Sequence, residues 1–312
     1  MRMKWGIVIA LLAPCWIAGA ETGVAKYAGE FISLGVGARA LAMGGAAVAL
    51  ANDVTAGYWN PAALSRIEKR SVHLMHANYL NAASFEYLAF GQNLGRYGAW
   101  GLGVQSFAAK GITQTDTAGV GSGTFSTDDT AFSLGWAMTV PKSSGTAWSG
   151  AAFGVSAKTI SSRIATTAQA TAVDIGVLSP ALWGDRLRLA LTSTNMGSKL
   201  KFDRDYEKLP QSIRLGAAVR PAGWWLASAD FAIPNHDSPY FAFGGEAVMG
   251  ATQEVRAAGR VGFNTRTLSD VSGFTGFSFG IGLSAGGWDF DYGIVPFGVL
   301  GLTHRFSIGV RF

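Results

Sequence analysis

Large apolar side chains alternate with small or polar ones along most of the chain, and this period of two limits the folds that it can adopt. Between residues 131 and 140 every second position is large and apolar, and the positions between are Ala, Ser, Gly or Thr. The same alternation recurs in residues 277–284 and 288–294. Because successive side chains of a β-strand point to opposite faces, each segment predicts a strand with one large apolar face. In the clearest segment that face consists of Phe132, Leu134, Trp136, Met138 and Val140.

The composition indicates what surrounds these apolar faces. Charged residues make up 14% of the 312 residues, against about a quarter in an ordinary soluble domain. A soluble β-sandwich also alternates, but it covers its outer faces with charge, whereas the second face here is mostly Gly, Ala and Ser. Beyond the N-terminus no run of 18 apolar residues occurs, which excludes transmembrane helices. Alternating segments of about ten residues are typical of bacterial outer-membrane barrels. We therefore expect an all-β fold, a transmembrane antiparallel β-barrel.

The spacing of the segments predicts about fourteen strands, and an even number is typical of bacterial barrels. Links after even-numbered strands are short, as at 93–96, 220–223 and 285–286, whereas most links after odd-numbered strands are longer. Residues 109–128 and 195–210 are predicted to be extracellular loops, which places the short turns on the periplasmic side. The short link near Asn81 departs from this rule. The expected strands begin near residues 71, 84, 97, 129, 148, 170, 186, 211, 223, 240, 254, 274, 287 and 302.

Three parts are predicted along the chain: a signal peptide at residues 1–20, an N-terminal hatch-like segment at 21–70 and the transmembrane barrel at 71–312. The first part has two basic residues, a short apolar stretch and an A-x-A site, so we expect cleavage after Ala20. Export to the outer membrane follows, and outer-membrane lipid and lipopolysaccharide are the expected surroundings. Lipidation at Cys15 is an alternative, but Pro14 stands where a lipobox has a small residue. Cleavage removes two of the 25 basic residues and none of the 20 acidic ones, and the remaining balance of +3 is too small to predict nucleic-acid binding.

The chain ends in an amphipathic strand with an aromatic last residue. This pattern predicts a C-terminal assembly signal that the barrel insertion machinery recognises. The alternative is a soluble edge strand that happens to end in phenylalanine. The residues of the expected signal are Phe306, Ile308, Val310 and Phe312.

The segment before the first strand is organised differently. It contains G-A-R-A-L-A-M-G-G at residues 37–45, an apolar run that ends at Asn52 and Asp53, and W-N-P-A at residues 59–62. These elements resemble the N-terminal region of the PorV/PorQ proteins within the FadL-like outer-membrane superfamily. Residues 291–307 resemble the last hairpin of the same family.

The resemblance implies a fourteen-stranded barrel whose N-terminal segment folds partly into the lumen as a hatch. The sequence does not distinguish a movable plug from a static filler. Small residues permit close backbone packing, and Asn-Pro is a turn dipeptide. The residues expected to form the hatch motif are Gly44, Gly45, Asn52, Asp53, Trp59, Asn60 and Pro61.

Two other groups of side chains are predicted to have defined positions in a barrel. Tryptophans near strand ends favour the membrane interface, where they form girdles; they are Trp100, Trp136, Trp148, Trp183, Trp224, Trp225 and Trp288. A set of charged residues shares the parity of the lumen and could pair across it; the set is Arg188, Arg214, Arg256, Arg260, Arg305, Arg311, Asp289 and Asp291.

Motifs for catalysis or cofactor binding are weak. Residues 276–280 match G-x-S-x-G, but a nucleophile elbow needs a strand followed by a helix, and the alternation continues through this stretch. Residues 35–40 mimic a dinucleotide fingerprint without a βαβ pattern. His73 and His76 point to opposite faces of one strand, so they cannot share a metal there. We expect no enzyme activity, no cofactor and no metal.

Two classes of function remain. In the first, which the resemblance to PorV and PorQ implies, the barrel acts in protein export or docks partner proteins such as secretion components. The alternative, which resembles the wider FadL-like group, is a passage channel for small hydrophobic compounds.

Overall fold

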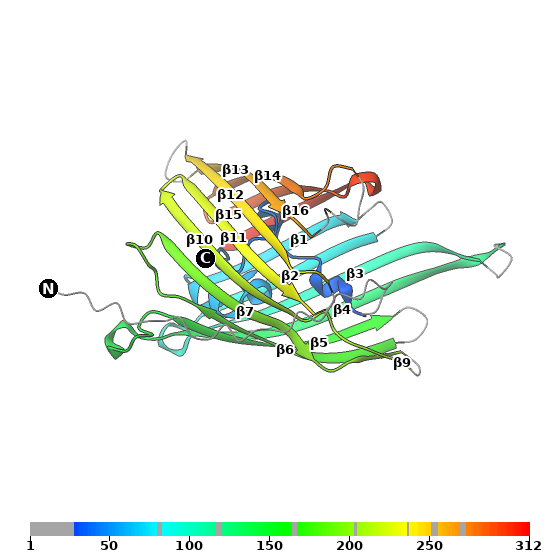
Figure 1. Ribbon diagram of the computed structural model, residues 1–312, viewed down its shortest axis with the longest axis horizontal. Helices are drawn as coiled ribbons and strands as arrows, with labels where there is room; N and C mark the ends of the chain where they lie inside the picture. The colour runs from blue at the N-terminus through cyan, green and yellow to red at the C-terminus, as the bar shows by residue number, and fades with distance from the viewer. Residues whose placement is uncertain are drawn as a thin grey trace.

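The computed structural model shows a closed β-barrel, and its described part covers residues 28–312 except 80–82, 116–119, 164–166, 203–204, 236, 251–254, 267 and 269–272. The predicted signal peptide and its cleavage site lie outside the described residues. Fourteen antiparallel strands form the wall (Figure 1), as the sequence predicts. They are β1 (Arg70–Tyr79), β2 (Ala83–Asn93), β3 (Ala99–Thr115), β4 (Gly121–Thr139), β5 (Ala152–Arg163), β6 (Thr167–Leu178), β7 (Leu187–Gly197), β10 (Ser212–Ala222), β11 (Trp225–Pro234), β12 (Tyr240–Gly250), β13 (Val255–Asn264), β14 (Phe277–Ala285), β15 (Trp288–Pro296) and β16 (Leu302–Arg311).

Each strand of the wall pairs with the wall strands before and after it in the sequence, and β1 pairs with β16 to close the barrel. Between β7 and β10 the chain forms a separate two-stranded sheet from β8 (Leu200–Phe202) and β9 (Asp205–Glu207). The first and last strands close the ring, with Val72 opposite Val310 and Leu74 opposite Ile308. Because every strand of the wall has a partner on both sides, the backbone polar groups are satisfied within the sheet, as a membrane requires.

Burial along the strands follows the predicted period of two. In β4, Phe132, Leu134 and Trp136 are exposed on the outer surface, while Ala131 and Ala137 between them are buried. The outer surface is therefore an apolar band that suits lipid, and the inner surface carries small and polar residues. The core of the molecule lies inside the barrel.

The two ends of the barrel differ. At one end, which we call the short-turn end, lie the beginning of β1, the end of β16 and compact links such as residues 223–224 and 286–287. All seven tryptophans of the predicted girdle lie on this side of the barrel, either in strand ends or in the links, and most are exposed. A membrane interface on this side of the barrel explains their position.

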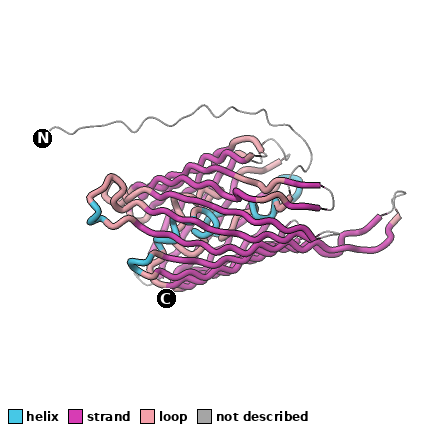
Figure 2. Tube along the Cα trace, turned by 90° about the horizontal axis from the view of Figure 1, so that it is seen from below, coloured by secondary structure: helices cyan, strands magenta, loops and turns pink. Residues whose placement is uncertain are grey.

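At the opposite, long-loop end, the strands extend further than predicted. Residues 109–128, expected to be a loop, are largely strand, because β3 and β4 continue their pairing with Ile112 opposite Phe125. The pairing of β3 with β2 ends at Ala109, and that of β4 with β5 begins at Asp128. A two-stranded ribbon therefore projects beyond the wall (Figure 2).

The segment before β1 occupies the lumen. Its described residues, 28–69, which we call the luminal segment, contain four short helices. Figure 1 shows them in blue, enclosed by the strands. No helix among the described residues is long and apolar enough to cross a membrane. The helices are η1 (Glu30–Ser33), α1 (Ala38–Ala42), α2 (Ala56–Trp59) and η2 (Pro61–Arg66).

Candidate functional site: the lumen and its N-terminal segment

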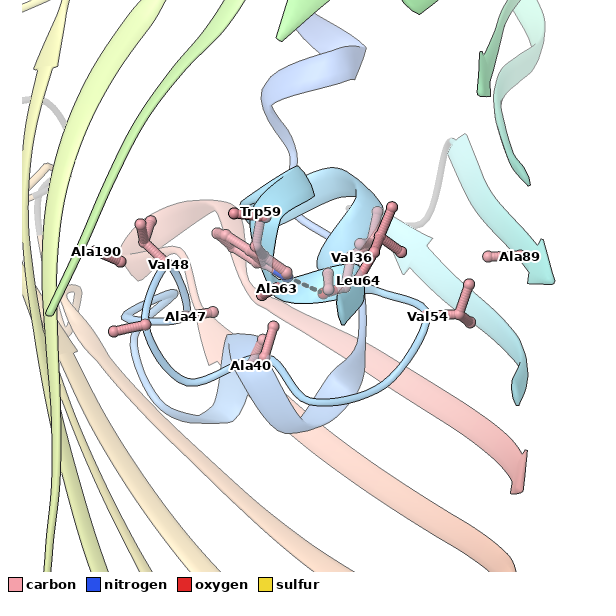
Figure 3. Packing of buried hydrophobic residues seen from close by; sticks show 14 of the residues in the cluster. Val36, Ala40, Ala47, Val48, Val54, Trp59, Ala63, Leu64, Ala89 and Ala190 are labelled. Carbon is pink, nitrogen blue, oxygen red and sulfur yellow. Dashed lines mark hydrogen bonds between the residues drawn. The ribbon is translucent and has the colours of Figure 1, made fainter. Parts of the chain in front are cut away.

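The luminal segment packs as a small core against the inner wall. Figure 3 shows Val36, Trp59 and Leu64 packed together, with Ala89 and Ala190 on strands on either side. Trp59 is fully enclosed, and its indole Nε1–H donates to the carbonyl oxygen of Val36 at 3.0 Å. Apolar burial of this kind is the main stabilising contribution to the seating of the segment.

Inward-facing glycines on the wall make this close approach possible. An added Cβ at Gly135 would lie 2.8 Å from Leu64 Cδ1, and one at Gly244 would lie 2.6 Å from Met43 Cβ. Several of these glycines are direct partners on adjacent strands. Together they form a belt on which the segment lies, made of Gly91, Gly101, Gly135, Gly154, Gly176, Gly216, Gly244, Gly262, Gly280 and Gly293. The sequence shows the glycine excess, but not that it serves this contact.

Gly44 and Gly45, the first residues of the predicted hatch motif, lie against β12 to β14. Gly44 has a φ of 70°, and a Cβ there would lie 2.7 Å from the carbonyl oxygens of Phe243 and Phe263. Its N–H donates to Ser278 Oγ at 3.0 Å. Both backbone conformation and space therefore require glycine at position 44.

Asn60 and Pro61 lie at a different part of the wall, against β5 and β6. The Asn60 amide donates to the carbonyl oxygens of Val48 and Val177, and its Oδ1 accepts from the Ala62 N–H at 3.0 Å. Pro61 takes the first position of η2, where a missing N–H is not needed. Asn60 is thus more than a turn residue, because it also links the segment to the wall. Its role in a hatch stays a prediction.

A chain of ion pairs connects α1 to the wall. Arg39 donates two hydrogen bonds to Glu246 of β12, both at 2.7 Å. Arg260 of β13 also contacts Glu246, at 2.8 Å, and reaches Asp291 of β15 at 2.7 Å. The pairing of Arg260 with Asp291, and that of Arg311 with Asp289, confirms that charges of the lumen parity pair there. The sequence reasoning missed Arg39 and Glu246, although Arg39 lies within the G-A-R-A stretch.

Asn52 and Asp53 of the hatch motif extend this polar cluster. Asn52 Oδ1 accepts from Arg39 Nη1 at 2.8 Å, and Asp53 Oδ1 accepts from the Thr55 N–H at 2.8 Å. Burial alone would raise the pKa of the Asp53 carboxyl, but His73, the Thr55 hydroxyl and Arg39 hold that pKa below its ordinary value. Asp53 is therefore an anion at neutral pH.

Further polar contacts hold the rest of the segment. Asp230 of β11 accepts hydrogen bonds from the N–H groups of Ala47 and Val48. Arg66 Nη1 donates to three carbonyl oxygens of residues 49–51. Burial, together with nearby guanidiniums such as Arg188, lowers the pKa of Arg66 to about 10.

Two cavities lie on opposite sides of the luminal segment. The outer cavity, toward the long-loop end, has a volume of about 460 Å³, and its lining includes the aromatic residues Trp59, Tyr79, Tyr240 and Phe297 and three arginines. The inner cavity, toward the short-turn end, has a volume of about 320 Å³ and a polar lining.

Helix α1 and the turn after it separate the two cavities. Arg39, Asn52 and Asp53 face the inner cavity, whereas Leu41, Gly44 and Gly45 face the outer one.

The serine of the weak catalytic motif and the two histidines of the candidate metal pair lie in strands of the barrel wall. Ser278 of the G-x-S-x-G match lies within β14, where its hydroxyl donates to Ala42 O and accepts from Gly44 N. His73 is buried and His76 is exposed, so they lie on opposite faces as expected. No group of three or more His, Cys, Asp or Glu suited to a metal ion occurs within the described part of the chain.

The residues of the expected C-terminal signal lie on the outer surface of β16. Phe306, Ile308 and Phe312 are exposed there. Phe312 also exchanges two backbone hydrogen bonds with Arg70 at the start of β1. The last residue therefore takes part in barrel closure, and recognition by the insertion machinery stays a prediction.

These features define a transmembrane β-barrel with its N-terminal segment folded into the lumen. Residues 17–133 match the family model described as "Uncharacterised protein family (UPF0164)". No curated protein matches the sequence significantly.

Solved structures with a similar fold include proteins that are described as channels. The "TodX deltaS2S3 mutant monoaromatic hydrocarbon channel" is 13% identical, with a TM-score of 0.60 over 89% of this chain and 99% of that chain. The "CymD monoaromatic hydrocarbon channel" is 10% identical, with a TM-score of 0.58 over 89% and 98%. A Pseudomonas aeruginosa FadL homologue is 11% identical, with a TM-score of 0.54 over 89% and 98%. The chain has the FadL-like barrel fold.

Proposed function

We propose that this protein is an outer-membrane channel that passes small, mainly apolar molecules through its barrel and past the luminal segment. The observation that carries the proposal is the aromatic-lined outer cavity of about 460 Å³, which α1 and the following turn separate from the inner cavity. If the luminal segment served only as a static filler, the barrel would need no apolar cavity of this size. Concave, mostly apolar spaces with a few polar groups are typical of small-molecule sites.

The structural relatives support the same class of cargo. TodX and CymD are described as monoaromatic hydrocarbon channels, and the aromatic lining of the outer cavity suits such molecules. We further propose that the barrel has no catalytic role, because Ser278 is used to hold the luminal segment.

The mechanism we propose is a displacement of α1 and the turn at residues 43–45. This stretch is held by polar contacts that can be exchanged, chiefly the Arg39–Glu246 pair and the bond from Gly44 N to Ser278. Both this stretch and residues 60–66 pack closely on the glycine belt. The first stretch lies between the two cavities, so its displacement is the step that we propose.

A disulfide lock tests this mechanism. An ideal Cβ at Gly293 would lie 3.6 Å from Ala42 Cβ, within the usual disulfide range of about 3.5–4.5 Å. We expect the variant with both Ala42→Cys and Gly293→Cys to support uptake of labelled toluene by intact cells when reduced, and to lose it when oxidised. Each single-cysteine variant is the matched control, and oxidation should leave its uptake unchanged. Equal uptake by the oxidised and reduced double variant, or no uptake above cells without the barrel, would overturn the proposal.

Partner docking in protein export is a second candidate, in line with the resemblance to PorV and PorQ. The observation that favours it is the projecting ribbon of β3 and β4. In the described part of the chain, the outer edge of β3 has no strand partner after Ala109, and that of β4 has none before Asp128. Such edges can accept an added strand from another protein.

Shortening the ribbon separates the two functions. Deleting residues 111–124 removes the projecting part without touching the pairing of β2 with β3 or of β4 with β5. Docking predicts that secretion components no longer co-purify while toluene uptake is unchanged. Unchanged co-purification would count against the docking role.

A further inference from the structure

Two arginines that face the outer cavity have no carboxylate partner among the described residues. Three arginines line this cavity. One of them, Arg266, pairs with both acidic residues of the cavity lining, with Asp237 at 3.0 Å and with Glu30 at 3.9 Å. Among the described residues, Arg214 and Arg305 form no ion pair.

Arg305 is the more enclosed of the two. Its side chain comes from β16, the residue is 2% exposed, and its guanidinium donates to the Tyr79 hydroxyl at 3.2 Å. The guanidinium carbon lies 5.5 Å from the Tyr79 ring centroid. A guanidinium has five N–H donors, so a single neutral acceptor leaves most of its hydrogen-bonding capacity open to the cavity.

Arg214 has similar surroundings. It donates to the Tyr240 hydroxyl at 2.6 Å and lies over the rings of Trp59 and Tyr240, at 5.4 Å and 5.7 Å. Asp230 on the next strand acts on Arg214 through its charge but forms no ion pair with it, and its Oδ2 accepts from the N–H groups of Ala47 and Val48. An aromatic face stabilises a cation less than an anionic partner does.

A buried guanidinium without a counter-ion is costly. The buried Arg305 and the half-buried Arg214 beside one cavity are therefore groups that an anionic ligand would stabilise, because guanidinium binds carboxylate through two parallel hydrogen bonds. The aromatic side chains of Trp59, Tyr79, Tyr240 and Phe297 around the same cavity offer ring faces and edges to the remainder of such a ligand.

We infer that the outer cavity binds aromatic carboxylates, with the carboxylate at Arg305, the ring among the aromatic side chains, and Arg214 adding positive charge to the same cavity. The inference rests on the proposed function in that it names the cargo class of the same cavity. It departs from a purely hydrocarbon cargo, for which two uncompensated guanidiniums would be a disadvantage.

Calorimetric binding to the purified barrel in detergent tests the inference directly. The probes are 4-methylbenzoate, its neutral methyl ester and octanoate. We expect the aromatic acid to bind at least about tenfold more tightly than the ester, since one charged hydrogen-bonded pair is worth at least this factor. Equal affinity for acid and ester would overturn the inference without any variant. Equal affinity for octanoate would overturn its aromatic part.

Arginine variants assign the site. Arg305→Gln and Arg214→Gln should each weaken binding of the acid and leave binding of the ester unchanged, and Arg305→Lys should retain part of the affinity. Arg96→Gln is the matched control, because Arg96 also donates to a tyrosine hydroxyl and lies over its ring, but in an exposed turn. Loss of acid binding in the control, or no loss in either cavity variant, would overturn the assignment.

The binding assay and the uptake assay test the inferred site and the passage function separately, so either proposal can fail without the other. Toluene uptake without binding of 4-methylbenzoate would overturn the inference and leave the channel function intact. Binding of 4-methylbenzoate without uptake of either compound would overturn the passage function and support the inferred site.

Discussion

At the scale of single residues, glycine decides whether the wall can hold the luminal segment. Gly262 and Gly259 both lie in β13, but Gly262 faces the lumen and Gly259 faces outward, so an added side chain would have different neighbours at the two positions. An added Cβ at Gly262 would meet Met43, Gly44 and Ser278, whereas one at Gly259 would meet nothing within 4 Å.

Alanine at these two positions should therefore have different effects. We expect Gly262→Ala to lower the free energy of unfolding by about 1–3 kcal/mol, as overpacking usually does. Gly259→Ala should change it by less than about 0.5 kcal/mol. Urea unfolding in lipid vesicles measures both, and equal effects would show that the close approach at Gly262 is unimportant.

The ion-pair chain permits a ranking of variants. Glu246→Gln leaves two guanidiniums, Arg39 and Arg260, without their shared carboxylate, and should cost about 3–5 kcal/mol. Arg39→Gln should cost less, because Glu246 keeps Arg260 and the Arg39 side chain is partly solvated. The same unfolding experiment gives both values, and the reverse order would contradict this description of the chain.

At the scale of the elements, β16 combines an outward apolar face with the closing contacts of the ring. We expect Phe312→Ala to slow assembly into the membrane and to leave the assembled barrel stable to within a few kcal/mol, the contribution of one buried side chain. The variant keeps the backbone bonds to Arg70, which a deletion would remove. Pulse-chase appearance of the folded form measures the rate, and a normal rate would argue against a targeting role.

The sequence predicted the strands well wherever one face of a strand meets lipid. Expected starts at 71 and 287 compare with Arg70 and Trp288. The largest difference is at β4, expected near 129 and beginning at Gly121. Residues 121–127 project beyond the wall, so neither face meets lipid and the alternation that marks a strand is missing.

The site was less predictable than the wall. The resemblance pointed to the segment and to the lumen, but not to the wall residues that the segment contacts. Arg39 and Glu246 are separated by 207 positions, and their meeting depends on the register of every strand between them. The two unpaired arginines of the outer cavity were on the predicted luminal set, yet only the structure shows which arginines have acidic partners.

At the scale of the whole molecule, the closed ring predicts resistance to detergent. With no unpaired strand in the wall, the barrel should migrate as a compact species on gels until it is boiled. A chain truncated after Gly301 lacks β16 and cannot close, so it should show no such shift. Identical mobility of the full chain before and after boiling would contradict the closed barrel.

The position of the luminal segment also constrains the order of folding. The segment precedes β1, yet the Ala38 N–H is held by the Ser307 hydroxyl, 269 positions later. Contacts of such long range form slowly, because the chain between them must first be brought together. The segment therefore cannot reach its final seat before the last strand arrives. It must stay inside the curling sheet until then, so ring closure and enclosure of the segment become a single late event.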